Sequence, residues 1–168
     1  FEDIFSNSIS GRVVLSETLG LLYYGALNGT EKLQLSFCSG DGGKVITSTF
    51  RTFSLSGRNY DMGYNYETYV INFCSEEFVV SEKYRISKSY KKQSVSDIVQ
   101  DILINTLKTQ KPVSVNQTSG VYDFVLPNKR IFDTINWLAS YGQVGSKQGA
   151  DMLFYENNDG YHLRSLQS

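Results

Sequence analysis

The sequence predicts an α+β fold that is mainly β. Aromatic residues are abundant, with 12 Tyr, 10 Phe and 1 Trp, and such side chains favour sheets and interfaces. In the first half of the chain, short apolar segments recur between turn residues, which is typical of a small barrel or sandwich. In residues 122–166 a strand, a helix and a hairpin follow one another, each with one apolar side that needs a partner.

Length and charge limit the possible functions. A chain of 168 residues forms one large or two small domains. The formal charge of −1 gives no general attraction to nucleic acid or to an acidic membrane. The longest mostly apolar run, residues 19–27, is too short to span a bilayer, so we expect no membrane insertion. The chain starts at Phe1 rather than Met, and we expect the intact protein to extend beyond one or both ends.

The first half has the pattern of a β domain. Strands are expected at residues 11–17, 31–39, 44–56 and 66–74, with a loop at 57–63. Residues 19–27 fit a short helix or a buried loop, and their glycines favour the loop. The apolar alternation slips along the third strand, which predicts a bulge near Arg51. The fourth strand is apolar on both faces, so we expect it to be central or covered by another subunit. We predict a tube-like β-barrel domain over residues 1–83.

The second half combines helices with short strands. Residues 94–107 carry one broad apolar stripe, and Ser94 with Asp97 forms a capping pair that starts a helix. A second helix is expected between a cap at Asn128 and a left-handed stop at Gly142. A final hairpin turns at residues 157–160. We predict an α+β domain over residues 84–168 that is truncated at its C-terminal side.

Catalytic groups are not recognisable in the sequence. His162 is the single histidine and has no nucleophile-elbow signature beside it, so we predict that it packs in a strand. The acid pairs Glu76–Glu77 and Glu156–Asp159 fall at predicted helix starts or turns, where acids are favoured without catalysis. We therefore predict no catalytic residues and no enzyme.

Cofactor and metal motifs are also not recognisable. Residues 156–160 lack the ligand spacing of a calcium loop, and the glycine cluster at 39–43, with Lys44, precedes a strand rather than the helix of a phosphate loop. Cys38 and Cys74 with one histidine do not complete a zinc site unless carboxylates help. We predict no cofactor-binding or metal-binding residues and two buried thiols; a disulfide between Cys38 and Cys74 remains open.

A basic run follows the predicted barrel. Its members are Lys83, Arg85, Lys88, Lys91 and Lys92. One interpretation is a solvated connector between the halves. The other is a patch for an acidic partner, and nucleic-acid binding ranks third because the overall composition is not basic.

Four segments resemble the baseplate hub proteins of contractile-tailed bacteriophages. They are FEDIFSNSISG at residues 1–11, YRISKSYKKQSVSDIVQDIL at 84–103, YDFVLPNKRIFDTINWLAS at 122–140 and MLFYENNDGYHLRSL at 152–166. The nearest relatives look like T-even-like and marine myovirus hubs, and a more distant likeness is to the hub part of type VI secretion spike proteins. The resemblance spans nearly the whole chain but only the N-terminal part of a hub.

The resemblance implies a structural role in the virion tail baseplate. Hubs of this family contain two similar β-barrels and form trimers, which gives a pseudo-sixfold ring. The partners implied are other copies of the chain, the tail tube protein, the central spike protein and DNA that passes without specific binding. Residues 1–83 would be the first barrel, and the second would lie beyond Ser168. A peptidoglycan-degrading tail enzyme and a carbohydrate-binding β module are the alternatives.

Overall fold

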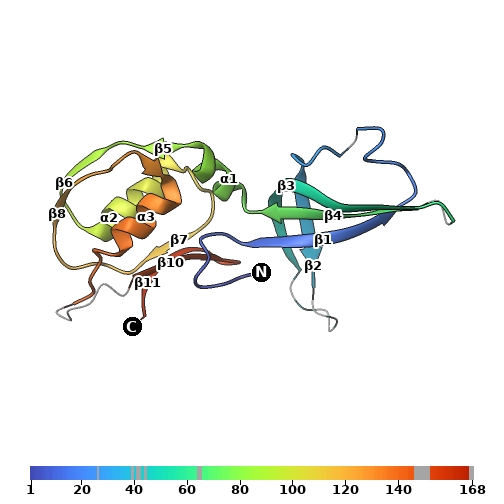
Figure 1. Ribbon diagram of the computed structural model, residues 1–168. Helices are drawn as coiled ribbons and strands as arrows, with labels where there is room; N and C mark the ends of the chain where they lie inside the picture. The colour runs from blue at the N-terminus through green and yellow to red at the C-terminus, as the bar shows by residue number, and fades with distance from the viewer. Residues whose placement is uncertain are drawn as a thin grey trace. The chain divides into compact units, whose positions relative to one another are not determined.

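The computed structural model describes residues 1–25, 27–38, 40, 43, 45–63, 66–145 and 152–166. The chain divides into two compact units (Figure 1). Unit 1 comprises Phe1 and Ser10–Glu76, and unit 2 comprises Glu2–Ile9 and Glu77–Ser168. Strands outnumber helices, which confirms the α+β, mainly β, class. The predicted domain boundary at residues 83 and 84 stays a prediction.

Unit 1 is a curled antiparallel sheet of four strands (Figure 1). The strands are β1 (Ser10–Glu17), β2 (Lys32–Phe37), β3 (Ile46–Asp61) and β4 (Tyr66–Cys74), in the order β1-β4-β3-β2. The strand predicted to be central, β4, lies between β1 and β3. Within the described residues the predicted barrel is a half-barrel, since four strands do not close on themselves and β1 and β2 each keep an unpaired edge.

Two irregularities bend β3. The register against β4 shifts between Thr52 and Ser54 and again between Ser56 and Asn59. The first shift confirms the predicted bulge and turns Phe53 outward, where it is 57% exposed. The second lets the strand continue to Asp61, so the loop predicted at residues 57–63 is wrong over most of its length.

One tight contact fixes the packing of the first strand. Gly11 of β1 lies directly opposite Phe73 of β4, and a Cβ at Gly11 would be 2.5 Å from the Phe73 ring. The ring also contacts Phe50 of β3, with 4.8 Å between centroids. Because Gly11 has no side chain, the aromatic pair formed by Phe73 of β4 and Phe50 of β3 can pack against β1.

In its described residues, unit 2 has three short α-helices and one π-helix among short strands. In chain order its elements are α1 (Glu76–Lys83, which starts at the unit boundary), β5 (Arg85–Ile86), β6 (Ser89–Gln93), α2 (Val95–Asp101), the π-helix η1 (Ile102–Thr106), β7 (Val113–Val115), β8 (Tyr122–Val125), β9 (Lys129–Arg130), α3 (Ile131–Ala139), β10 (Met152–Asn157) and β11 (Gly160–Ser165). β5 pairs with β9, β6 with β8, and β11 with both β10 and β7. In Figure 1, α2 and α3 lie between the β5, β6 and β8 strands and the β10-β11-β7 sheet.

The core of unit 2 forms where the helices meet this sheet. Fully buried members include Val95, Ile98, Val99, Ile102, Ile131, Ile135, Leu138, Tyr161 and Leu163. The apolar stripe predicted for residues 94–107 faces this core, and its last turn is the π-helix. Ser94 accepts a hydrogen bond from the Asp97 amide at 3.1 Å, as the capping pair predicts.

The caps predicted for the second helix are wrong. Asn128 has a φ of +53° and lies before β9, so the helix starts only at Ile131, after Lys129–Arg130 have paired with β5. The helix ends at Ala139, with Ser140 as its C-cap, and Gly142 does not adopt a left-handed conformation. Strand pairing thus delays the helix start by two residues.

The last hairpin and β7 share one sheet. Gly160 has a φ of +131°, and any side chain there would collide with the carbonyl group of Pro112. This close approach lets the Tyr161 amide donate to the Pro112 carbonyl at 2.9 Å, just before β7 runs parallel to β11. Glycine at this position therefore joins β7 to the hairpin.

Candidate interaction sites

The single histidine packs against an aromatic side chain of the neighbouring strand. His162 stacks on Tyr155 with 5.1 Å between ring centroids, and its Nε2 lies 2.8 Å from the Asn157 side-chain oxygen. Burial, together with the charge of Arg164, lowers the pKa of His162. Within the described ranges, no three His, Cys, Asp or Glu side chains gather as a metal site would need.

The neighbouring acids Glu76 and Glu77 have separate basic partners. Glu76 pairs with Lys32 and with Arg51 of the half-barrel, each at 3.2 Å. Glu77 instead pairs with Lys111 at 2.8 Å. The predicted acid pair is therefore split between two ion clusters rather than aimed at a common groove.

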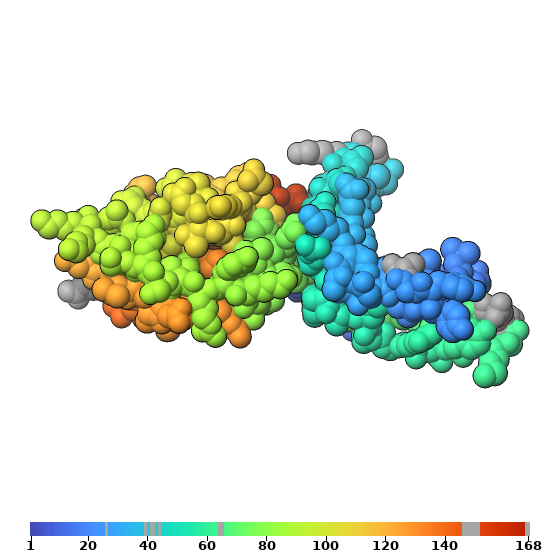
Figure 2. Space-filling model, turned by 90° about the horizontal axis from the view of Figure 1, so that it is seen from above, coloured from blue at the N-terminus to red at the C-terminus, as the bar shows by residue number. Residues whose placement is uncertain are grey.

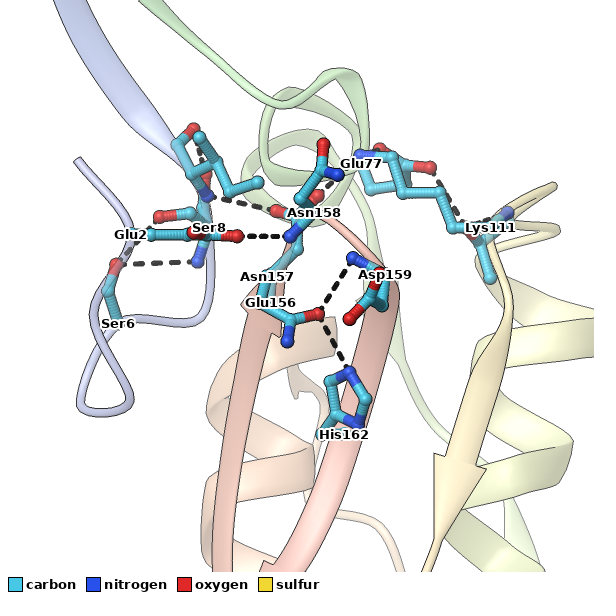
Figure 3. Close-up of polar contacts among 12 residues, drawn as sticks. Glu2, Ser6, Ser8, Glu77, Lys111, Glu156, Asn157, Asn158, Asp159 and His162 are labelled. Atoms are coloured by element: carbon cyan, nitrogen blue, oxygen red, sulfur yellow. Dashed lines mark hydrogen bonds and ion pairs between the residues drawn. The ribbon is translucent and has the colours of Figure 1, made fainter. Parts of the chain in front are cut away.

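The fold also brings together three residues whose proximity the sequence did not indicate. Lys111 Nζ lies 2.8 Å from Glu77 and 2.5 Å from Glu156, and we call these three residues the Lys111 cluster (Figure 3). The Glu156 side chain is fully buried. Burial disfavours the ammonium, but the hydrogen bonds to Glu156 and Glu77 outweigh it and raise the pKa of Lys111. Asp159, the predicted partner of Glu156, lies in the hairpin turn.

The N-terminal segment is held on unit 2 by the same region. The Ile9 amide donates to Glu156 Oε2 at 2.9 Å, and the Asn7 side-chain amide donates to the Phe154 carbonyl at 2.8 Å. At the hairpin tip, the Asn158 amide donates to the Glu2 carboxylate (Figure 3). Glu156 therefore links the last hairpin, the segment before β7 and the start of the chain.

The two faces of the half-barrel differ in polarity. One face carries the buried Tyr69, Ile71 and Phe73 of β4. On the other face, the Asn72 amide donates to the Ser54 hydroxyl at 3.0 Å and to the Ser56 hydroxyl at 3.1 Å. Hydroxyl pairs extend this polar face, namely Ser16 with Thr68 and Ser36 with Thr47.

Unit 1 exposes many large apolar side chains for its size. They include Val14, Leu19, Tyr23, Tyr24, Phe37, Val45, Phe53 and Tyr60. Large exposed apolar areas and unpaired strand edges are typical of surfaces that meet another chain. The half-barrel therefore offers contact surfaces of the kind that an assembly needs.

The members of the basic run are solvent-exposed, as the interpretation of a solvated segment predicts, but they belong to elements of unit 2 rather than to a separate connector. Arg85 lies in β5, opposite Arg130 of β9. Lys88 pairs with Asp101 at 2.7 Å, and the Tyr90 hydroxyl donates to the same carboxylate at 2.6 Å. These two hydrogen bonds lower the pKa of Asp101 to about 2. Burial, then the bond to Asp101, raises the pKa of Tyr90 to about 12.

Several remaining predictions concern thiols, loops and membrane helices. Cys74 is buried as predicted, whereas Cys38 is exposed, and both are thiols without a disulfide between them. Most of the glycine cluster at 39–43, together with Lys44, lies outside the described residues, so the hairpin predicted there stays a prediction. Among the residues that the structure describes, no helix has the length and apolar character that crossing a bilayer requires.

Sequence comparison identifies a phage relative. No family model matches the chain. The chain is 26% identical over 164 residues to the probable baseplate hub protein gp334 of Vibrio phage KVP40. The match covers 95% of this chain and 38% of that protein, so the chain spans well under half of this curated relative.

Structure comparison identifies tail and secretion proteins with the same fold. A 43 kDa tail protein of prophage MuSo2 from Shewanella oneidensis matches with a TM-score of 0.58 at 14% identity, over 96% of this chain and 48% of that one. The E. coli c3393 protein, a type VI secretion component described as similar to the T4 tail proteins gp27 and gp5, matches with a TM-score of 0.62 at 9% identity, over 94% of this chain and 42% of that one. The resemblance to baseplate hub proteins of contractile-tailed phages that the sequence predicts is thus confirmed over nearly the whole chain.

Proposed function

We propose that this chain is a structural part of a baseplate hub in the tail of a phage virion. The observation that carries this proposal is the 26% identity to a baseplate hub protein over 95% of the chain. The half-barrel followed by an α+β unit agrees with it, since tail and type VI secretion proteins share this fold. The role is mechanical: the chain holds neighbouring tail components together.

The surfaces of unit 1 support assembly with other chains. Among the described strands, β1 and β2 lie at the two ends of the sheet, so each has an edge whose backbone groups a neighbouring strand can use. Exposed aromatics such as Phe37 and Phe53, each 57% exposed, supply apolar area beside these edges. A second copy of the chain is the partner that the predicted trimer with a pseudo-sixfold ring requires.

The finer part of the proposal concerns the tube, the spike and DNA. The ring would contact the tail tube protein on one side and the central spike protein on the other. A formal charge of −1 suits a channel that lets DNA pass without binding it. Residues 1–83 would act as the tube-like domain, and residues 84–168 as the start of the hub domain.

A non-enzymatic role fits the environments of the carboxylates better than hydrolysis does. Glycoside hydrolysis needs two carboxylates that flank an open groove. Glu156 is buried against Lys111, and Glu76 is paired with Lys32 and Arg51. The peptidoglycan-degrading alternative is therefore not favoured, and neither comparison favours a carbohydrate-binding module.

Light scattering of the full-length protein, coupled to size-exclusion chromatography, tests the proposal. A trimer over the accessible concentration range is expected. A strict monomer would contradict the ring. A zymogram with purified protein over peptidoglycan at several pH values tests the enzymatic alternative separately, and a cleared band would contradict the non-enzymatic role.

A further inference from the structure

Two glutamates lie opposite each other on adjacent strands of the half-barrel. Glu17 of β1 is directly opposite Glu67 of β4 in the register. Like charges directly opposite each other destabilise a strand pair. Glu67 is also only 5% exposed, and a buried carboxylate is costly unless cations or hydrogen bonds compensate it. The half-barrel thus carries two negative charges at a place where they oppose folding.

Among the described residues, these two charges have one cationic partner. Glu67 pairs with the guanidinium of Arg58. Glu17 accepts backbone hydrogen bonds from Leu19, Gly20 and Leu21 at 2.5, 2.8 and 2.9 Å. These amides orient the carboxylate but carry no formal charge. Two carboxylates and one guanidinium leave a formal charge of −1.

A buried hydroxyl lies beside the two acids. Tyr69 is two residues after Glu67 on the same strand, so its side chain is on the same face. It has 0% exposure, and its hydroxyl has no hydrogen-bond partner among the described residues. Burial, followed by the charges of Glu17 and Glu67, raises the pKa of Tyr69. Tyr69 therefore lies in the negative field of the two carboxylates.

Beside these groups lies a cavity with aromatic walls. It has a volume of about 310 Å³ and is lined by Glu17, Arg58, Glu67, Tyr23, Tyr24 and Tyr60, among others. The rings of Tyr23 and Tyr24 meet edge to face at 5.3 Å, and each residue is 79% exposed. Figure 2 shows the blue loop that carries them and the green end of β3 and β4 in the same part of unit 1. Aromatic faces attract organic cations.

We propose that this cavity binds an alkylammonium or guanidinium group. The unbalanced carboxylate supplies the charge, and the tyrosine rings supply faces for the alkyl part. The group belongs either to a lysine or arginine side chain of another polypeptide or to a free polyamine. Both sources present the same chemistry, and the proposal does not depend on the hub function.

Titration of the whole chain with n-butylammonium chloride, followed by ¹H–¹⁵N NMR at low ionic strength, tests the proposal. The amides of Leu19, Gly20 and Leu21 report on the site because they donate to Glu17. We expect saturable shifts at these amides with n-butylammonium and none with n-butanol, which has the same alkyl chain without the charge. Equal shifts with both probes, or no saturable shift with n-butylammonium, would overturn the proposal.

Two variants of the site and one control variant test which residues bind the cation. Tyr24→Ala removes one exposed ring and is expected to weaken n-butylammonium binding about fivefold. Phe37→Ala, which removes a 57% exposed ring from β2, is the matched control and should leave binding unchanged. Glu67→Gln should weaken binding about tenfold if the variant folds, as judged by its NMR dispersion. Unchanged binding in Tyr24→Ala would overturn the proposal whether or not Glu67→Gln folds.

The source of the cation is decided by competition at equal ionic strength. Tighter binding of Nα-acetyl-lysinamide than of spermidine would indicate a side chain of another polypeptide. Tighter binding of spermidine would indicate a free polyamine. Failure of both to displace n-butylammonium would overturn the proposal.

Discussion

Replacing Lys111 by Met should strongly destabilise unit 2. The ammonium lies 2.8 Å from Glu77 and 2.5 Å from Glu156, whose side chains are 14% and 0% exposed. Met keeps the length and apolar stem of Lys but leaves two poorly solvated carboxylates without a cation. Removing one partner of a buried ion pair costs about 3 to 5 kcal/mol. Because the Lys111 side chain is 31% exposed, we expect the lower end, about 3 kcal/mol.

Urea unfolding followed by tryptophan fluorescence measures this loss. Trp137 is the single tryptophan and lies in α3, so its emission reports on unit 2. A loss of about 3 kcal/mol corresponds to a midpoint lower by about 2 M urea. The control Lys91→Met, at an exposed position of β6, should change the free energy of unfolding by less than about 0.5 kcal/mol.

A double variant tests the cause of the loss. Adding Glu156→Gln to Lys111→Met removes the uncompensated buried charge while an amide oxygen can still accept from the Ile9 amide. The double variant should therefore be more stable than Lys111→Met alone. A loss below about 1 kcal/mol in Lys111→Met, or simple additivity in the double variant, would refute the reasoning.

Three further predictions concern other parts of the fold. Asp101→Asn should lower the free energy of unfolding by up to about 2 kcal/mol near neutral pH, because the folded pKa of Asp101 is lowered to about 2. The unsubstituted protein should lose the same stabilisation as the pH falls from about 4 to about 2. Equal pH dependence of the unfolding free energy in urea titrations of the two proteins would contradict this. Leu138→Ala should cost about 3 kcal/mol in the fluorescence assay because Leu138 is fully buried, and a loss below about 1 kcal/mol would count against the assigned core. Gly11→Val should lower the free energy of unfolding by about 1 to 3 kcal/mol in thermal unfolding followed by circular dichroism, because the new side chain would clash with Phe73. An unchanged melting temperature would contradict the close packing of Gly11 on Phe73.

Local periodicity predicted much of the fold. The double-sided apolar pattern of residues 66–74 indicated a central strand, and β4 is one. Ser94 and the apolar stripe after it predicted α2, because capping and amphipathicity are properties of neighbouring residues. The start of α3 was missed because Lys129–Arg130 pair with Arg85–Ile86, a contact across more than forty residues that no local signal reports.

The ion clusters were beyond sequence reasoning for the same physical reason. Glu77, Lys111 and Glu156 are separated by 34 and 45 residues and have no motif in common. The sequence placed Glu156 with Asp159 in a predicted turn, whereas in the structure Glu156 belongs to β10 and its side chain is buried. The pairing of Glu17 with Glu67 follows only from the register of β1 against β4, which the sequence does not determine.

The most direct test of the central claim is electron cryo-microscopy of tails from virions that contain the full-length protein. We predict that three copies form a ring between the tail tube and the central spike, with the half-barrels of unit 1 lying against neighbouring chains. Density for the protein outside the baseplate, or as isolated copies that do not contact each other, would contradict the account.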